Sequence, residues 1–136
     1  MLNGELMNTA IIGLGSNINP AYNIEKARAL LSQKYTIRGQ SDFIKTKPIG
    51  FPDQADFING AVFIETTQDQ PELRTALKEI ETTLGRTKSQ NKFGPRTIDL
   101  DILIFNDKVV HQDFYTRDFI PKLVLALKPN LKIDHR

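Results

Sequence analysis

Hydrophobic and polar positions follow a strand-like period in several segments of the chain, and these segments predict a sheet. Residues 9–14 are short, apolar and rich in isoleucine, which predicts a buried strand that runs into a tight loop at residues 13–17. Residues 35–46 and 57–67 carry β-branched and aromatic side chains in loose alternation. We expect two further strands there, joined by a loop that prolines stiffen.

Two other segments repeat apolar residues at helical spacing. Residues 20–34 begin at the proline of an Asn19-Pro20 pair, which is typical of a helix start. Asp69 and Glu72 have the spacing of a capping box, and the apolar stripe behind them ends at Gly85, a residue favoured just beyond helix ends. The sequence therefore predicts a second helix between Asp69 and Gly85.

Residues 97–105 alternate strictly and predict a strand with two different faces. One face carries Ile98, Leu100, Ile102 and Ile104, and the other carries Asp99, Asp101, Leu103 and Phe105. The resulting order of strand, helix, strand, strand, helix, strand predicts an α+β fold of the ferredoxin-like class, an antiparallel sheet with helices packed against one side. Residues 108–110 indicate a short further strand, and residues 120–127 form an apolar segment to which the pattern assigns no element.

Length and composition describe one ordinary globular domain over residues 1–136, with residues 1–8 as a frayed leader. The absence of cysteine excludes thiolate catalysis, disulfides and cysteine-ligated metals. A net charge of +2 is too small to indicate a nucleic-acid or membrane partner. With no apolar run long enough to span a membrane and no secretion signal, we expect a cytoplasmic monomer that acts on small molecules.

The carboxylates Asp99 and Asp101 are the first candidates for chemistry. Two residues apart on a strand, they leave the same face and suit Mg²⁺, which binds a few carboxylates together with water and phosphate oxygens. Taken alone, the pair could equally be two solvated acids on an open strand face. A stretch of four cations without an acid, residues 86–96 with Arg96 as the last, precedes the pair and favours a polyphosphate ligand.

Phe57 and Asn59 indicate a second ligand, because an aromatic ring can stack on a flat heterocycle while an amide reads its edge. The alternative is that Phe57 is a core residue and Asn59 a turn residue. Residues 13–17 fit neither glycine-rich phosphate-binding fingerprint, since the third glycine and the P-loop lysine are absent. We interpret them as a tight turn.

Several motifs together resemble a known enzyme family. They are Gly-Leu-Gly-Ser-Asn at residues 13–17, Thr-x-Pro-x-Gly at 46–50, Gln-x-Asp-Phe-x-Asn at 54–59, Gly-Arg at 85–86 and Lys-Phe-Gly-Pro-Arg-Thr-Ile-Asp-Leu-Asp-Ile-Leu at 92–103. This set is similar to that of the 6-hydroxymethyl-7,8-dihydropterin pyrophosphokinases of folate biosynthesis. The resemblance implies a ferredoxin-like enzyme that moves the β,γ-diphosphate of ATP, as co-substrate, to the hydroxymethyl group of the pterin.

The resemblance also implies roles for individual residues. Asp99 and Asp101 would bind two Mg²⁺ ions, and Arg86 and Arg96 would clamp phosphates. The residues implied in ATP binding are Glu81, Lys88, Arg96, His111 and Arg117. Those implied in pterin binding are Thr46, Ile49, Phe57, Asn59, Phe93 and Phe119, and the loops at residues 47–56 and 86–94 would be mobile lids.

Two other functions are weighed against catalysis. The connection between Phe105 and His111 is several residues shorter than is usual in the family that the chain resembles. This difference favours a diverged paralogue that binds pterin or nucleotide with little or no transfer. An RNA-binding module of the same fold class would need a basic, aromatic sheet face, whereas Asp99 and Asp101 would repel phosphate in the absence of metal. The intact carboxylate pair and Arg96 favour the enzyme.

Overall fold

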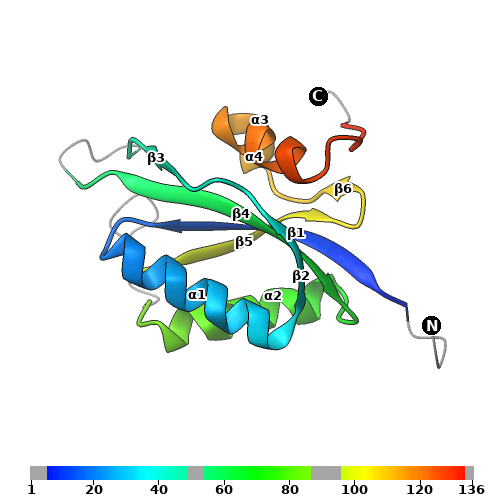
Figure 1. The fold of residues 1–136 in the computed structure, drawn as a ribbon, viewed down its shortest axis with the longest axis horizontal. Coiled ribbons are helices and arrows are strands. Elements are labelled where there is room, and N and C mark those ends of the chain that lie inside the picture. Colours follow the sequence, from blue (N-terminus) through cyan, green and yellow to red (C-terminus); the bar gives the residue numbers. More distant parts are fainter. Residues whose placement is uncertain (1–5, 49–53, 87–95, 134–136) are drawn as a thin grey trace.

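The computed structural model describes residues 6–48, 54–86 and 96–133, which contain six strands and four helices (Figure 1). The strands are β1 (Asn8–Ser16), β2 (Thr36–Gln40), β3 (Ile44–Thr46), β4 (Phe57–Thr66), β5 (Asp99–Phe105) and β6 (Lys108–Val109). The helices are α1 (Pro20–Lys34), α2 (Gln70–Thr83), α3 (Asp113–Thr116) and α4 (Phe119–Leu127). The strand order is β2-β4-β1-β5-β6, β3 also pairs with β4, and every pairing is antiparallel. The predicted α+β ferredoxin-like class is confirmed.

Helices lie on both faces of the sheet, so the prediction that they pack against one side is wrong. In Figure 1, α1 and α2 run side by side along one face, where Ile12 and Leu77 belong to the larger buried cluster. The shorter α3 and α4 lie on the opposite face, where Ile11 and Val124 belong to a second buried cluster. These short helices cover part of the face that RNA-binding modules of this class leave open, which argues against the RNA-binding alternative.

The alternation predicted for β5 holds only as far as Ile102. Ile12 pairs with Ile102 and Ile11 pairs with Ile104, so Leu103 is an extra residue at a β-bulge. Ile104 consequently packs with Ile11 in the second cluster, and the prediction that it shares the face of Ile102 is wrong. The two aspartates precede the bulge, so their shared face is preserved.

Both ends of α2 form as predicted. The Asp69 side chain accepts the Glu72 N–H, and the Glu72 side chain accepts the Asp69 N–H, which completes the capping box. Gly85 has a φ of 98°, in the left-handed region that favours glycine. The Arg86 N–H then donates to the carbonyl oxygen of Glu81, so this turn folds Arg86 back over the last turn of α2.

Three segments differ from their prediction. The single strand expected at residues 35–46 is two strands, β2 and β3, both paired with β4. The tight turn expected at residues 13–17 is wrong for its first four residues, because β1 continues to Ser16 between β4 and β5. The unassigned apolar segment at residues 120–127 lies in α4.

None of the helices in the described residues is long and apolar enough to cross a membrane.

Candidate active site

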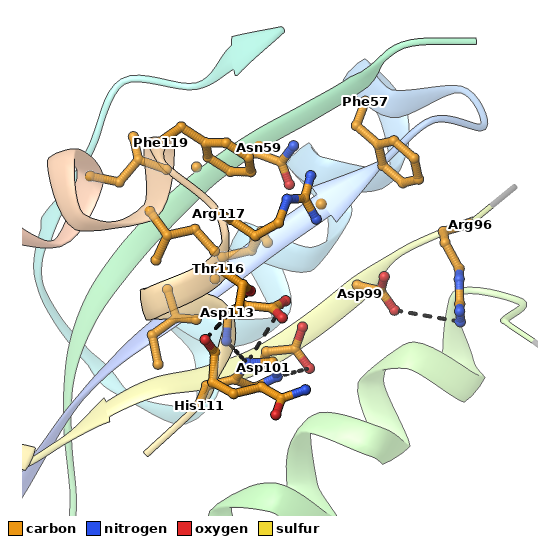
Figure 2. Close-up of a pocket in the computed structure, with 18 of the residues that line it drawn as sticks. Phe57, Asn59, Arg96, Asp99, Asp101, His111, Asp113, Thr116, Arg117 and Phe119 are labelled. Carbon is orange, nitrogen blue, oxygen red and sulfur yellow. Dashed lines mark hydrogen bonds and ion pairs between the residues drawn. The ribbon is translucent and has the colours of Figure 1, made fainter. Parts of the chain in front are cut away.

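A cavity of about 620 Å³ lies between the sheet and the short helices. Strands β1, β4 and β5, the end of α2 and the segment from His111 to α4 all contribute to its wall (Figure 2). Nine of the sequence-predicted residues line it: Phe57, Asn59, Arg86, Arg96, Asp99, Asp101, His111, Arg117 and Phe119. Residues spread over more than sixty positions of the chain are thus gathered around one space.

The carboxylates of Asp99 and Asp101 lie close to different basic side chains. Asp99 Oδ1 lies 3.2 Å from an Arg86 nitrogen and 3.9 Å from an Arg96 nitrogen. Asp101 Oδ1 lies 3.8 Å from His111 Nε2. Asp99 therefore has the stronger local compensation of its charge.

Burial dominates the protonation of this pair. It raises the pKa of Asp99, and the Arg86 guanidinium offsets part of the rise. Burial, followed by the negative charge of Asp99, raises the pKa of Asp101 to about 6. Two adjacent carboxylates whose charge is incompletely balanced by the protein fit a hard divalent cation.

The described residues supply only part of a coordination shell for such a cation. Within these ranges no group of three or more histidine, cysteine, aspartate or glutamate side chains is arranged to hold a metal. A pair of carboxylates that leaves the remaining positions to water and phosphate matches the preference of Mg²⁺. The donor set therefore fits Mg²⁺ bound together with a phosphate ligand.

Arg86 and Arg96 provide buried positive charge at the same wall. The Arg96 side chain is only 7% exposed. In the described part of the chain the Nε atoms of both arginines are buried and have no hydrogen-bond partner. Because an unpaired buried donor costs free energy, the protein leaves both guanidinium groups incompletely satisfied beside the carboxylate pair.

Glu81 lies behind this wall, and its contacts were not anticipated. Its side chain is 3% exposed, and Oε2 accepts the backbone N–H of Leu100 at 2.7 Å. Oε1 accepts a hydrogen bond from Arg86 at 2.9 Å and lies 3.3 Å from Lys78 Nζ. The carboxylate thus joins α2 to the backbone between the two aspartates; its contact with ATP stays a prediction.

Asn17 is another residue whose role the sequence did not indicate. Its side-chain amide donates to Gln54 Oε1 at 2.7 Å and to the Ala55 carbonyl at 3.1 Å. Its Oδ1 accepts the Arg96 N–H at 2.7 Å. Asn17 therefore ties the end of β1 to the end of the first predicted lid and to Arg96, two residues after the second, and only its place in the motif at residues 13–17 could have drawn attention to it.

Aromatic and amide side chains form the opposite part of the cavity. Asn59 Nδ2 donates to Thr46 Oγ1 at 2.6 Å, which joins two residues predicted to contact the pterin. In the view of Figure 2, Asn59 lies between Phe57 and Phe119. The Arg117 guanidinium stacks 4.9 Å from the centre of the Phe119 ring.

His111 has a defined orientation. Its Nδ1 accepts the Asp113 N–H at 3.1 Å, so the neutral ring carries its proton on Nε2, which faces Asp101. Asp113 and Lys78 also line the cavity although the sequence analysis did not select them. The available signals were their spacings, two residues after His111 and three residues before Glu81.

Three predicted site residues lie outside the described residues: Ile49, Lys88 and Phe93. Most of the two predicted lids, residues 47–56 and 86–94, lies outside them as well. The arrangement that is described brings a carboxylate pair, two buried arginines and an aromatic-amide wall to one cavity. Such a cavity can hold a polyphosphate beside a flat heterocycle and neutralise charge during phosphoryl transfer.

The chain is similar to a family of known enzymes. The family model described as 7,8-dihydro-6-hydroxymethylpterin-pyrophosphokinase (HPPK) matches residues 11–129. The 2-amino-4-hydroxy-6-hydroxymethyldihydropteridine pyrophosphokinase of Bacillus subtilis (strain 168) is 41% identical over 124 residues, 83% of this chain and 74% of the relative. The protein of the same name from Haemophilus influenzae is 35% identical over 84% of this chain and 78% of the relative. That from Aquifex aeolicus is 34% identical over 92% and 83%.

Proposed function

The chain belongs to the 7,8-dihydro-6-hydroxymethylpterin-pyrophosphokinase family, and on this premise we propose how its own residues carry out the transfer. As a member it is a pyrophosphokinase of folate biosynthesis. The proposed reaction joins the hydroxymethyl oxygen of 6-hydroxymethyl-7,8-dihydropterin to the β-phosphorus of ATP. The bond from that phosphorus to the α-phosphate bridging oxygen breaks, AMP leaves, and the hydroxyl proton passes to solvent.

Asp99 and Asp101 hold Mg²⁺ in this proposal, with two ions expected alongside the triphosphate. When bound, the metal supplies positive charge that neutralises the phosphate oxygens as the diphosphate moves. The support is the shared cavity face of the two carboxylates and their raised pKa values, because a divalent cation relieves the charge that the protein leaves uncompensated.

Arg86 and Arg96 orient the phosphates. Their place on the cavity wall supports this role, since a guanidinium group can bind a phosphate through two parallel hydrogen bonds. His111 presents its Nε2 proton to the same region, and we assign it, with Glu81, Lys88 and Arg117, to the ATP side. Positioning by cations suffices for this chemistry, because phosphoryl transfer needs in-line geometry and charge stabilisation more than a covalent nucleophile.

The pterin is assigned to the wall opposite the phosphate site. Phe57 and Phe119 stack on its rings, while Asn59 and Thr46 meet its polar edge, with Ile49 and Phe93 completing the pocket. The support is that the aromatic and amide lining and the carboxylate pair belong to one cavity, which brings the pterin hydroxymethyl group and the phosphates together. Because one chain lines the whole described cavity, we propose that a monomer is active.

The observation that carries the proposal is the single cavity shared by the carboxylate pair, Arg86, Arg96 and Asn59. The shortened connection does not displace His111, whose ring lines the same cavity and faces Asp101. This geometry supports transfer over binding alone.

ATP labelled in its γ-phosphate tests the transfer. The proposal predicts label in a pterin that carries two phosphates, with unlabelled AMP as the other product. Release of ADP and a pterin with one phosphate would contradict the assigned bond cleavage. Failure to transfer any label would favour the pterin-binding paralogue.

A further inference from the structure

Gly15 occupies an unusual place in the sheet. It lies on β1, paired with Asn59 of β4 on one side and with Asp99 of β5 on the other. Its backbone is not in the left-handed region, unlike that of Gly85, so the local conformation does not require glycine. Some other constraint must act at this position.

That constraint is the space above Gly15. A Cβ atom at residue 15 would lie 2.6 Å from Asn59 Oδ1, closer than atoms in contact can approach. The next atoms it would meet are Asn59 Cγ at 3.6 Å and the Ile58 carbonyl oxygen at 4.0 Å. The collision therefore involves the amide of Asn59 and spares the backbone.

The two ends of the Asn59 amide are held from two different strands. Its Nδ2 donates to Thr46 Oγ1 of β3 at 2.6 Å, and its Oδ1 lies over Gly15 of β1. The amide thus spans the surface of β4 along the sheet. A methyl group at residue 15 would displace Oδ1 and turn the amide away from Thr46.

We propose that Gly15 is a positioning residue for the pterin, because the absence of its side chain fixes the orientation of the Asn59 amide. This inference rests on the proposed role of Asn59 at the pterin edge. It gives Gly15, the second glycine of the motif at residues 13–17, a function unrelated to phosphate cradling. Position 15 requires a residue without a side chain, because the Asn59 amide that binds the pterin lies directly over it.

Two other strand glycines, Gly13 and Gly39, face different side chains. A Cβ at Gly13 would approach Leu103 Cδ1 at 3.1 Å, the end of a flexible side chain. A Cβ at Gly39 would approach Leu127 Cδ2 at 3.3 Å, and Gly39 lies on β2, away from the cavity. Gly39→Ala is therefore the matched control for Gly15→Ala, since both add one methyl to a strand glycine.

The first measurement compares two ligands on the same variants. Isothermal titration follows 6-hydroxymethyl-7,8-dihydropterin in the presence of Mg²⁺ and α,β-methylene-ATP, and separately follows Mg²⁺ with α,β-methylene-ATP alone. Gly15→Ala should weaken pterin binding about tenfold, the equivalent of one hydrogen bond, with less than about a twofold change for the nucleotide. Gly39→Ala should change neither affinity.

A double-mutant cycle then tests whether Gly15 acts through Asn59. In the Asn59→Ala background the colliding oxygen is gone, so adding Gly15→Ala should cost no further pterin affinity. The same cycle on thermal unfolding should show Gly15→Ala as less destabilising in that background. The unfolding measurement reports the contact whether or not a variant binds ligand.

Each outcome separates this inference from the proposed function. If Asn59→Ala weakens pterin binding but Gly15→Ala has no effect, or acts equally in both backgrounds, Gly15 is not a positioning residue and the pterin site stands. Equal losses of pterin and nucleotide affinity in Gly15→Ala would also overturn the inference. If Asn59→Ala leaves pterin binding unchanged, the assigned role of Asn59 fails, and the inference fails with it.

Discussion

Replacing Glu81 with alanine should reveal how the site is anchored to the core. The outer edge of β5 is paired with β6 only at Ile104 and Phe105, so no strand among the described residues lies beside the N–H of Leu100 on that edge. The Glu81 carboxylate fills that position and accepts this N–H at 2.7 Å, while also binding Arg86 at 2.9 Å. Removing the carboxylate leaves two buried donors without their acceptor.

The expected magnitude follows from those two bonds. An unsatisfied buried donor costs about 1–3 kcal/mol, and breaking a buried ion pair by removing one partner costs about 3–5 kcal/mol. Because Arg86 keeps its contact with Asp99, we expect Glu81→Ala to lower the free energy of unfolding by about 3–4 kcal/mol. For a domain of this size the melting temperature should fall by roughly 4 °C per kcal/mol.

Urea unfolding of three variants measures this effect. Glu81→Gln keeps an acceptor for Leu100 and should lose about half as much stability as Glu81→Ala. Glu79→Ala removes an exposed carboxylate from the same helix and should change stability by less than about 0.5 kcal/mol. If Glu81→Ala is no less stable than Glu79→Ala, the buried carboxylate does not anchor β5 and the reasoning is refuted.

The remaining predictions concern ligands and pH. The elevated pKa of Asp101, about 6, means that the folded protein binds this proton more tightly than the unfolded chain. In Mg²⁺-free buffer, Asp101→Asn should therefore be more stable than wild type above pH 6, and the difference in melting temperature should shrink toward about pH 4. Saturating Mg²⁺ should make the wild type the more stable protein. A difference in melting temperature that grows on acidification would contradict the raised pKa of Asp101. Asn59→Ala should weaken pterin binding by about tenfold or more and ATP binding much less, as calorimetry can measure, whereas equal losses would refute its edge-reading role. Arg96→Lys should raise the KM for ATP and lower kcat because lysine lacks the planar fork of arginine, and unchanged kinetics would exclude Arg96 from phosphate binding.

The sequence predicted those features whose interactions join residues close together in the chain. The capping box at Asp69 and the glycine at residue 85 are such cases, because both ends of each interaction lie within a few positions. The bulge at Leu103 was not predictable, since it depends on how β5 pairs with β1. The helix at residues 119–127 could not be predicted either, because its apolar face is defined only by the sheet surface that it covers.

The candidate site likewise contains residues that sequence spacing predicted and contacts that it could not predict. Period-two alternation placed Asp99 and Asp101 on one face, and the cavity contains both. The contacts of Glu81 with Leu100 and of Asn17 with Gln54 join residues 19 and 37 positions apart, so no spacing rule could identify them. The resemblance to a family supplied roles for side chains, but the geometry supplied the supporting contacts.

Formation of AMP from ATP and Mg²⁺, with and without 6-hydroxymethyl-7,8-dihydropterin, tests the central claim most directly. The wild-type protein and Asp101→Asn are compared at equal concentration, after thermal unfolding has verified that the variant is folded. We predict AMP that depends on the pterin in the wild type and falls by at least about a hundredfold in Asp101→Asn, as expected when a transition-state charge loses its metal site. Undiminished pterin-dependent AMP in Asp101→Asn would contradict the assignment of the carboxylate pair.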